Sequence, residues 1–386
     1  MPRERYRTEP FPSGGFSIRV SGGVPIQGGP TFTSGARAKT WKRCVDETGK
    51  GTDHPLLIEL DDRSGLRPLN GEFGVVGSSD FRQYVEYYGG LWVNLVDTHL
   101  AISLPSLQNS ATTLLARTNP SRADVGLLNF IYELKDLPGM LRDIGDFKLN
   151  KKRVIRSPRD LANHNLSLQM GWIPLISDIT KLLHFTSSVD KRVDELKRLY
   201  SNEGLKRRIT LANESTSGVI STTIESNLSH LINVNRHKIT HVKRWGTVRW
   251  LPTVLPAIPV ESEQMRRFAM SLVLGSRIDA EFLWNAIPWT WLVDWATNTG
   301  EYIRAHSNHV PCVATKVNIM TQTTTTTVWK RTDSRTYYKG GDGITLLSTK
   351  ERAQPVANLS GTLPFLNARR LSILGSLALQ RLGRRR

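Results

Sequence analysis

A small group of potential metal ligands is the clearest starting point for chemistry in this sequence. His306, His309 and Cys312 lie close together, and imidazole nitrogens and thiolate sulfurs are ligands that zinc prefers. A closed zinc site needs four ligands, and the neighbouring sequence offers no fourth. The segment also has the character of a loop at a helix end. The spacing therefore favours an ordinary loop, and we predict no metal and no other cofactor.

Catalytic side chains are equally hard to assemble. A hydrolase needs a nucleophile, a base and a group that orients the base, and we find no nucleophile elbow and no Cys/His signature. The run Gly340-Gly341-Asp342-Gly343 places one carboxylate among glycines, which is typical of a turn rather than a polymerase metal site. We therefore predict no catalytic residues and a protein that is not an enzyme.

The charge balance points instead to binding. The 386-residue chain carries 52 Lys and Arg against 34 Asp and Glu, a formal net charge of +18. An excess of this size is typical of proteins with a polyanionic partner, most often nucleic acid. A merely soluble basic protein is the alternative. The excess is concentrated in two segments, residues 148–159 and 369–386.

The elements that must position these segments begin with strands. Over residues 1–118, glycine pairs separate short alternating runs, which indicates strands and turns. Helical character starts at Asn119, a good N-cap residue, with Pro120 at the first helical position. This helix is predicted to continue to about Ile144.

The clearest helix is predicted over Pro174–Tyr200, where apolar residues recur at three- and four-residue spacing and Gly204 offers a stop. Within the later strand region, Thr323–Thr327 suits an exposed strand and Gly340–Gly343 suits a hairpin turn. The remaining predicted elements are strands at 209–260 and 313–350 and helices at 158–170, 261–286, 288–305 and 361–386.

This alternation predicts an α+β protein. The economical solution is one β-rich region and one helix-bundle region, each assembled from discontinuous segments of the chain. The β-rich region is assigned to residues 1–118, 209–260 and 311–360, and the helical region to residues 119–208, 261–310 and 361–386.

Membrane and disulfide-based architectures are disfavoured. No apolar stretch approaches the ~20 residues of a membrane span, and the N-terminus lacks an apolar secretory segment. Two cysteines, Cys44 and Cys312, do not make a disulfide framework, and the sequence leaves their redox state open. We expect no membrane span and synthesis in the cytoplasm.

Two sequence blocks are specific enough to suggest a family. The first is Leu168-Gln-Met-Gly-Trp-Ile-Pro-Leu-Ile-Ser-Asp-Ile179 and the second is Trp284-Asn-Ala-Ile-Pro-Trp-Thr-Trp-Leu-Val-Asp-Trp295. In order and separation, both resemble the signature blocks of maturation (attachment) proteins from levivirus-type single-stranded RNA bacteriophages. The residues that carry the resemblance are Gly171, Trp172, Pro174, Asp178, Trp284, Pro288, Asp294 and Trp295.

The tryptophans of these blocks have two interpretations. In the first they form an aromatic core where two helical segments cross, and Asp178 and Asp294 cap or pair inside it, because a buried carboxylate needs hydrogen bonds. In the second they are exposed and stack on bases. Helix packing would bury their faces, which favours the core.

The resemblance implies an elongated α+β virion protein without an active site. In this family one copy replaces a coat-protein dimer in the capsid. The helical region faces inward and binds the phage genomic single-stranded RNA near its 3′ end. The β-rich region engages the host receptor, typically a pilus, and the protein then accompanies the RNA during genome entry.

Within that expectation, the two basic segments are candidates for contacts with RNA phosphates, since arginine suits bidentate phosphate binding. A solvated charged face is the alternative, and it weighs more heavily for the linker than for the tail. The candidate RNA-binding residues are Lys148, Lys151, Lys152, Arg153, Arg156, Arg159, Arg369, Arg370, Arg381, Arg384, Arg385 and Arg386.

Receptor contacts are expected in the Gly-rich N-terminal third and the Thr-rich strands at 315–335, on edges or loops. Two rival classes are a cellular RNA-binding protein, which would share the charge but not the two blocks, and an enzyme acting on nucleic acid. Some members of the family also lyse the host by blocking a cell-wall biosynthetic enzyme, and the sequence does not decide that here.

Overall fold

A computed structural model gives the architecture, and the chain divides into two compact units. The first unit comprises Met1–Leu107, Thr210–Gly246 and Asn318–Pro355, and the second comprises Gln108–Ile209, Thr247–Val317 and Val356–Arg386. The prediction of a mixed α+β protein is confirmed. The structure describes residues 2–9, 15–21, 24–31, 39–47, 53–66, 69–74, 81–87, 97–124, 162, 165–166, 168–169, 173, 177, 180, 184–225, 231–254, 259, 262–275, 290–307, 309–332, 338–340, 342–360 and 368–382.

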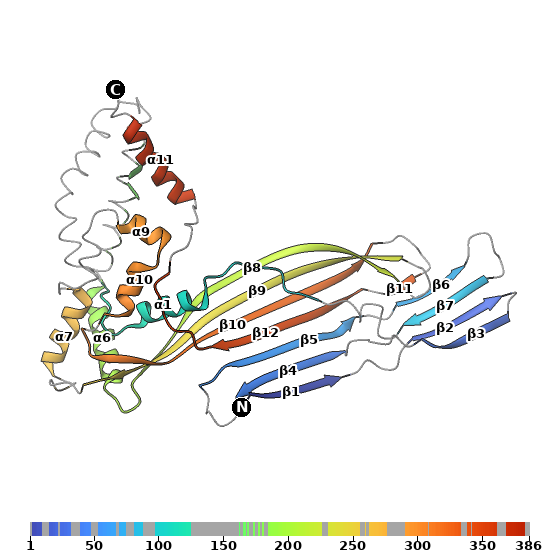
Figure 1. Cartoon of the computed structure of the whole chain (residues 1–386), viewed down its shortest axis with the longest axis horizontal. Helices are drawn as coiled ribbons and strands as arrows, with labels where there is room; N and C mark the ends of the chain where they lie inside the picture. Colours follow the sequence, from blue (N-terminus) through green and yellow to red (C-terminus); the bar gives the residue numbers. More distant parts are fainter. Residues whose placement is uncertain are drawn as a thin grey trace. The chain divides into compact units, whose positions relative to one another are not determined.

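The larger sheet has seven strands in the order β1-β4-β5-β12-β10-β9-β8, which lie side by side in Figure 1. The pairs β1–β4, β4–β5, β5–β12 and β12–β10 are all antiparallel. Strands β5 and β12 are neighbours in the sheet but distant in sequence. The sheet therefore joins strands from residues 2–66 to strands from residues 205–353. The bounds are β1 Pro2–Glu9, β4 Thr40–Glu47, β5 Leu56–Leu66, β8 Leu205–Glu225, β9 Leu231–Pro252, β10 Cys312–Arg331 and β12 Gly343–Ala353.

A second sheet has five strands in the order β11-β6-β7-β2-β3. Strand β11 pairs with β6 in this sheet, whereas β12 pairs with β5 and β10 in the larger one. The hairpin predicted at Gly340–Gly343 is therefore wrong, because the strands on either side of these glycines belong to different sheets. The bounds are β2 Gly15–Ser21, β3 Val24–Thr31, β6 Leu69–Gly74, β7 Phe81–Tyr87 and β11 Tyr338–Gly340.

Alternation along β9 gives the larger sheet a buried face and an open face. Even-numbered residues from Lys238 to Arg244 are buried, whereas Ile239 is 47% exposed and Lys243 is also exposed. Successive side chains of a strand point to opposite faces, so one face carries the core. The strands predicted at 209–260 are confirmed as β8 and β9.

The threonine run of β10 contributes to that core. Thr325 and Thr327 are both 0% exposed, so the prediction of an exposed strand over Thr323–Thr327 is correct for the strand but wrong for its exposure. Burial is possible because the hydroxyls have polar partners. The hydroxyls of Thr325 and Thr240 lie 2.7 Å apart, and Thr327 Oγ1 donates to Asp97 Oδ2 at 2.7 Å.

Asp97 is the centre of this polar core. Lys238 Nζ lies 2.5 Å from Asp97 Oδ1, and both side chains are almost fully buried, at 0% and 2% exposure. Thr345 Oγ1 also donates to Asp97 Oδ2, at 3.1 Å. Burial alone would raise the pKa of Asp97, but Lys238 and the threonine hydroxyls outweigh it and hold that pKa below its usual value.

The segment that follows Asp97 is fixed to the sheet by further polar contacts. The ring nitrogens of His99 lie 2.8 Å from the Thr325 hydroxyl and 3.0 Å from the Thr349 hydroxyl. Burial lowers the pKa of His99, which favours the neutral ring. Further along, Arg244 Nη1 donates to the carbonyl oxygen of Pro105 at 2.5 Å.

The described helices lie largely where helices were predicted. The described helices in these ranges are α6, α7, α9, α10 and α11, which confirms helical structure there. Helix α6 begins at Phe185, after a turn at His184, so the unbroken helix predicted from Pro174 is wrong in its continuity. Helix α1 was missed, because residues 1–118 were expected to form strands and turns. It buries Ala111 and Leu114 completely. The bounds are α1 Leu107–Thr118, α6 Phe185–Leu199, α7 Glu263–Leu274, α9 Thr290–Ala296, α10 Thr299–Ala305 and α11 Ala368–Leu382.

Asn119 follows the end of α1 instead of capping a new helix, so the N-cap prediction is wrong. Its side-chain oxygen accepts from the Ser121 amide at 2.8 Å. Its amide nitrogen donates to the carbonyl oxygens of Arg304 and Ser307 at 3.0 and 2.9 Å. Asn119 thus links the end of α1 to the end of α10. The rest of the helix predicted to Ile144, from residue 125, lies outside the described residues.

Ser262 and Gly275 set the ends of α7. The Ser262 hydroxyl accepts from the Met265 amide at 3.2 Å, which is the usual N-cap contact. Gly275 has a φ of 57°, the left-handed conformation that commonly ends a helix. Helix α7 therefore stops at Leu274, earlier than the predicted end at Ala286.

Gly204, predicted as the stop for the long helix, lies in the turn between α6 and β8 and has a φ of 68°. A Cβ at this position would collide with the backbone oxygen of Trp250. Replacing Gly204 by alanine should therefore lower the free energy of unfolding by about 1–3 kcal/mol. Urea unfolding would measure this against Gly218→Ala, where the added Cβ meets Leu100 at an ordinary 3.5 Å. Equal effects of the two substitutions would contradict the expectation.

Candidate nucleic-acid interface

Helix α11 packs one face against the rest of the second unit, to which it belongs, and exposes another face to solvent. Ile373 and Ser376 are 6% and 7% exposed, whereas Leu371 is 52% exposed. Asn165 holds the inner face by donating to the hydroxyls of Ser372 and Ser376 at 2.8 and 2.9 Å. The helix is therefore fixed in place, and its outer face is available to a partner.

Two neighbouring arginines at the start of α11 have different surroundings. The guanidinium of Arg370 lies 5.2 Å from the ring centroid of Trp295, a cation–π arrangement that joins α11 to the end of α9. Arg369 is exposed, and within the described part of the chain its one contact is a long hydrogen bond of 3.4 Å to the Gln169 carbonyl. Arg370 thus has a packing role, and Arg369 is the more accessible cation.

The structure does not describe the side chains of the other candidate residues. Arg381 belongs to α11, but the placement of its side chain is outside the described residues. The predicted RNA-binding residues that lie entirely outside the described residues are Lys148, Lys151, Lys152, Arg153, Arg156, Arg159, Arg384, Arg385 and Arg386.

Of the two signature blocks, the structure describes a continuous stretch longer than two residues only at the end of the second, residues 290–295. Asp294 Oδ1 accepts from the backbone amide of Gly300 at 3.0 Å, at the start of α10. Because α9 and α10 are separated at Thr297 and Asn298, the single helix predicted from Pro288 to Ala305 is wrong in its continuity. The block residues outside the described set are Gly171, Trp172, Pro174, Asp178, Trp284 and Pro288.

Arg192 of α6 is at the centre of a cluster of charged residues that was not predicted from the sequence. Arg192 is 1% exposed and donates to the carbonyl oxygens of Pro120 and Arg122 at 2.9 and 3.0 Å. It also pairs with Asp124 at 3.0 Å and with Glu195 at 3.2 Å. The cluster therefore fastens α6 to the turn after α1. No short motif signals the cluster, because among the described partners of Arg192 only Glu195 is nearby in the chain, while Pro120, Arg122 and Asp124 lie 72, 70 and 68 positions away.

Glu195 is the shared anion of this cluster. Arg122 Nη2 lies 3.0 Å from Glu195 Oε1, and Arg207 pairs with the same oxygen. Burial would raise the pKa of Glu195, but Arg122 and Arg192 outweigh burial and lower that pKa. These arginines are occupied in holding the fold together, which makes them poor candidates for RNA phosphates.

The residues first considered as metal ligands have other contacts. A ring nitrogen of His306 lies 2.8 Å from the carbonyl oxygen of Tyr302. Cys44 and Cys312 are both free thiols, and burial raises the pKa of Cys312 to about 11. Across the described stretches of the chain, no three His, Cys, Asp or Glu residues are grouped closely enough to hold a metal ion. In the same stretches, none of the helices has both the length and the apolar character of a membrane span.

These features define a basic α+β protein of two units whose α11 helix carries an accessible arginine. The family model described as phage maturation protein matches residues 137–344, which is more than half of the chain. The chain therefore belongs to the phage maturation protein family, as the two sequence blocks predicted. No curated protein matches it.

Proposed function

We propose that this chain is the single-copy maturation protein of a single-stranded RNA phage. It binds the genomic RNA near its 3′ end, takes a place in the coat shell, and mediates adsorption to a host pilus and genome entry. It acts by binding rather than by catalysis. The observation that carries the RNA part is the accessible Arg369 on an anchored helix, in a chain of this family.

Electrostatics supports the RNA part of the proposal. The chain has a net charge of +18, and helix α11 contains no acidic residue. Folded RNA is recognised largely through its shape, its phosphates and its unpaired loops. An arginine that projects from a fixed helix loses little further freedom when it pairs with a phosphate. Arg369 therefore has the position and the chemistry for such a contact.

The proposal also assigns roles to the two regions predicted from the sequence. Residues 119–208, 261–310 and 361–386 face the RNA and the capsid in an elongated molecule. Residues 1–118, 209–260 and 311–360 face the receptor. Burial of Thr325 and Thr327 removes those two side chains from the candidate receptor surface, and the strand edges and loops stay candidates.

Arg369→Gln tests the RNA contact. One phosphate contact fewer should reduce the slope of log K against log salt by roughly 0.7–0.9 for genomic 3′-end RNA. The matched control is Arg267→Gln on α7, since the Arg267 side chain is 78% exposed and its one partner among the described residues, Glu263, lies 4.0 Å away. Filter binding of the purified chain over a salt series measures both slopes.

Crosslinking inside the particle tests where the contact lies on the genome. Peptides from 368–382 should crosslink near the genomic 3′ end. If Arg369→Gln and Arg267→Gln change the slope equally, and crosslinks are scattered over the genome, α11 only neutralises charge and the specific contact is wrong. An absence of the chain from particles would refute the virion role itself.

A further inference from the structure

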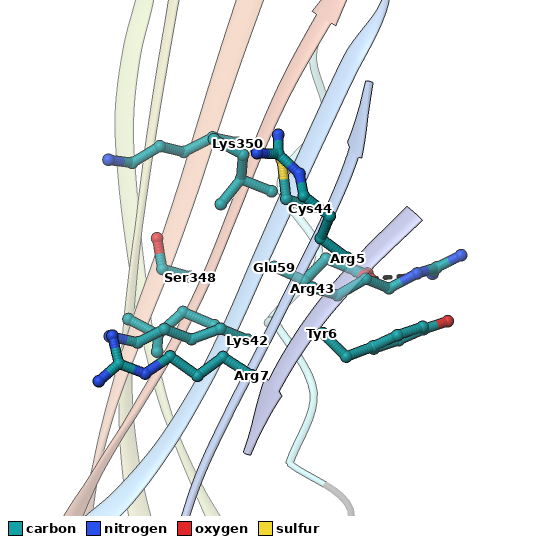
Figure 2. Close-up of a pocket in the computed structure, with 11 residues that line it drawn as sticks. Arg5, Tyr6, Arg7, Lys42, Arg43, Cys44, Glu59, Ser348 and Lys350 are labelled. Atoms are coloured by element: carbon teal, nitrogen blue, oxygen red, sulfur yellow. Dashed lines mark hydrogen bonds and ion pairs between the residues drawn. The ribbon is translucent and has the colours of Figure 1, made fainter. Parts of the chain in front are cut away.

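The open face of the larger sheet carries a pocket of about 390 Å³ in the first unit. The strands that line it are β1, β4, β5 and β12. Figure 2 shows Arg7, Lys42, Ser348 and Lys350 extending to one side of these strands, while Tyr6 and Arg43 extend to the other. The volume lies within the range of ordinary ligand pockets, which is about 300–1,000 Å³.

The strand register arranges the pocket residues in two rows. In one row Arg7 lies opposite Lys42 and Lys42 opposite Leu60, which in turn lies opposite Ser348. In the parallel row the order from β1 to β12 is Arg5, Cys44, Ile58 and Lys350. Directly opposite residues share one face of a sheet. The pocket therefore has aliphatic side chains at its centre and cations on both sides of them.

Cations outnumber acids among the residues that line the pocket, and Glu9, in the next row of the same face, is close enough to Arg7 for an electrostatic interaction. Arg5 pairs with Asp46 at 2.5 Å. The one acidic residue among those that line the pocket is Glu59, and it pairs with Arg43 at 3.0 Å. Arg7 and Lys42 lie directly opposite each other, an arrangement that destabilises a sheet when both charges have the same sign. An anionic ligand would remove that repulsion.

The side chains at the centre of the pocket favour an acidic peptide over a single-stranded nucleic acid. Ile58 is 36% exposed, and among the described residues that line the pocket the one aromatic side chain, Tyr6, points away from the Arg7 side in Figure 2. Proteins that bind single-stranded nucleic acid usually stack bases on aromatic rings. An acidic peptide instead combines carboxylates with aliphatic side chains, which matches the cations and the Ile58–Leu60 centre.

We propose that this pocket binds an acidic segment of a protein partner. Carboxylates of the segment pair with Arg7, Lys42 and Lys350, and an aliphatic side chain between them packs on Ile58. Ser348 Oγ is positioned to donate a hydrogen bond to the same ligand. The proposal concerns the first unit, whereas α11 belongs to the second. It goes beyond RNA binding by α11 and does not depend on that RNA binding.

A fluorescent hexapeptide of alternating Glu and Leu tests this proposal. Its binding to the purified full-length protein is followed by fluorescence anisotropy at low salt, with a hexauridylate RNA as competitor. Lys42→Glu should weaken peptide binding by about tenfold, because it replaces an attraction by a repulsion next to the carboxylates. Lys330→Glu is the control, since Lys330 is exposed on β10, outside the pocket, and the change in charge is the same.

Thermal unfolding separates loss of the site from loss of the fold. Lys42→Glu places a carboxylate opposite Arg7, so it should raise the midpoint of unfolding while it removes peptide binding. Peptide binding that is unchanged by Lys42→Glu, or equally reduced by Lys330→Glu, would overturn the proposal. Displacement of the peptide by equimolar hexauridylate would overturn it too, and would identify the pocket as a nucleic-acid surface.

Discussion

Replacing Lys238 by methionine should lower the free energy of unfolding by about 3–5 kcal/mol, because it leaves a buried carboxylate without its counter-charge. Lys238 Nζ lies 2.5 Å from Asp97 Oδ1 in a region where neither side chain is more than 2% exposed. Lys238 Nζ also donates to the carbonyl oxygen of Thr98 at 2.6 Å. Methionine fills similar space but supplies neither the charge nor the donors.

Urea unfolding of the purified chain would measure this loss. The control is Lys243→Met on the same strand, where the lysine is exposed and a change below about 0.5 kcal/mol is expected. The double variant Lys238→Met with Asp97→Asn should recover part of the loss, since the uncompensated charge is gone. Equal effects at positions 238 and 243 would show that the ion pair contributes nothing.

The pH dependence gives an independent check on the same pair. The pKa of Asp97 is lower in the folded chain than in the unfolded chain, so the unfolded state binds more protons at acid pH. The stability from Asp97 is therefore present above the unfolded value of about 3.9 and is lost as the pH falls through the lower folded pKa. In Lys238→Met, burial would raise the pKa of Asp97 instead. The variant should then lose stability as the pH rises above the unfolded value of about 3.9, toward the raised folded pKa of Asp97.

The second large effect is expected from replacing Arg192 by methionine, which should lower the free energy of unfolding by about 3 kcal/mol or more. The oxygen atoms that now accept hydrogen bonds from the Arg192 guanidinium would all lose that donor. Arg192 donates to two carbonyl oxygens of the turn after α1 and pairs with Asp124 and Glu195. Glu195 would keep Arg122 and Arg207 as partners. The turn carbonyls would have no replacement donor from methionine.

Lys191→Met is the matched control for Arg192→Met, since Lys191 is the exposed neighbour on the same helix. Urea unfolding should separate the two variants, and limited proteolysis should cut Arg192→Met faster in the turn that contains Arg122. A stable Arg192→Met with an intact turn would mean that packing of α6 against α7, rather than the arginine, positions this part of the unit.

The sequence was sufficient for those elements whose pattern is local. The alternation along β9 and the three- and four-residue spacing of α6 predict a strand and a helix without any knowledge of their partners. Helix α1 was missed because Leu107–Thr118 is rich in Thr, Ser and Asn, which do not favour helices. Its buried Ala111 and Leu114 are explained by packing, which single-sequence patterns do not contain.

Long-range polar contacts limited prediction of the sites. The burial of Thr325 and Thr327 depends on partners such as Asp97, which is 230 residues from Thr327. Arg369 and Arg370 are adjacent in a basic tail and were predicted to have the same role. Only the position of Trp295, 75 residues earlier by subtraction, distinguishes them. No spacing rule for short motifs reaches that far.

The pairing of β5 with β12 has a consequence for synthesis on the ribosome. Leu66 ends β5 and Gly343 begins β12, so 277 residues separate the two positions by subtraction. At roughly 5–20 residues per second, one edge of β5 emerges roughly 15–55 s before the strand that will cover it. During that interval the nascent chain carries an unpaired strand edge, which can pair with other chains. Completion of this sheet therefore waits until residues 343–353 have been translated, and a chain truncated before residue 343 would keep this edge of β5 unpaired and open to pairing with other chains.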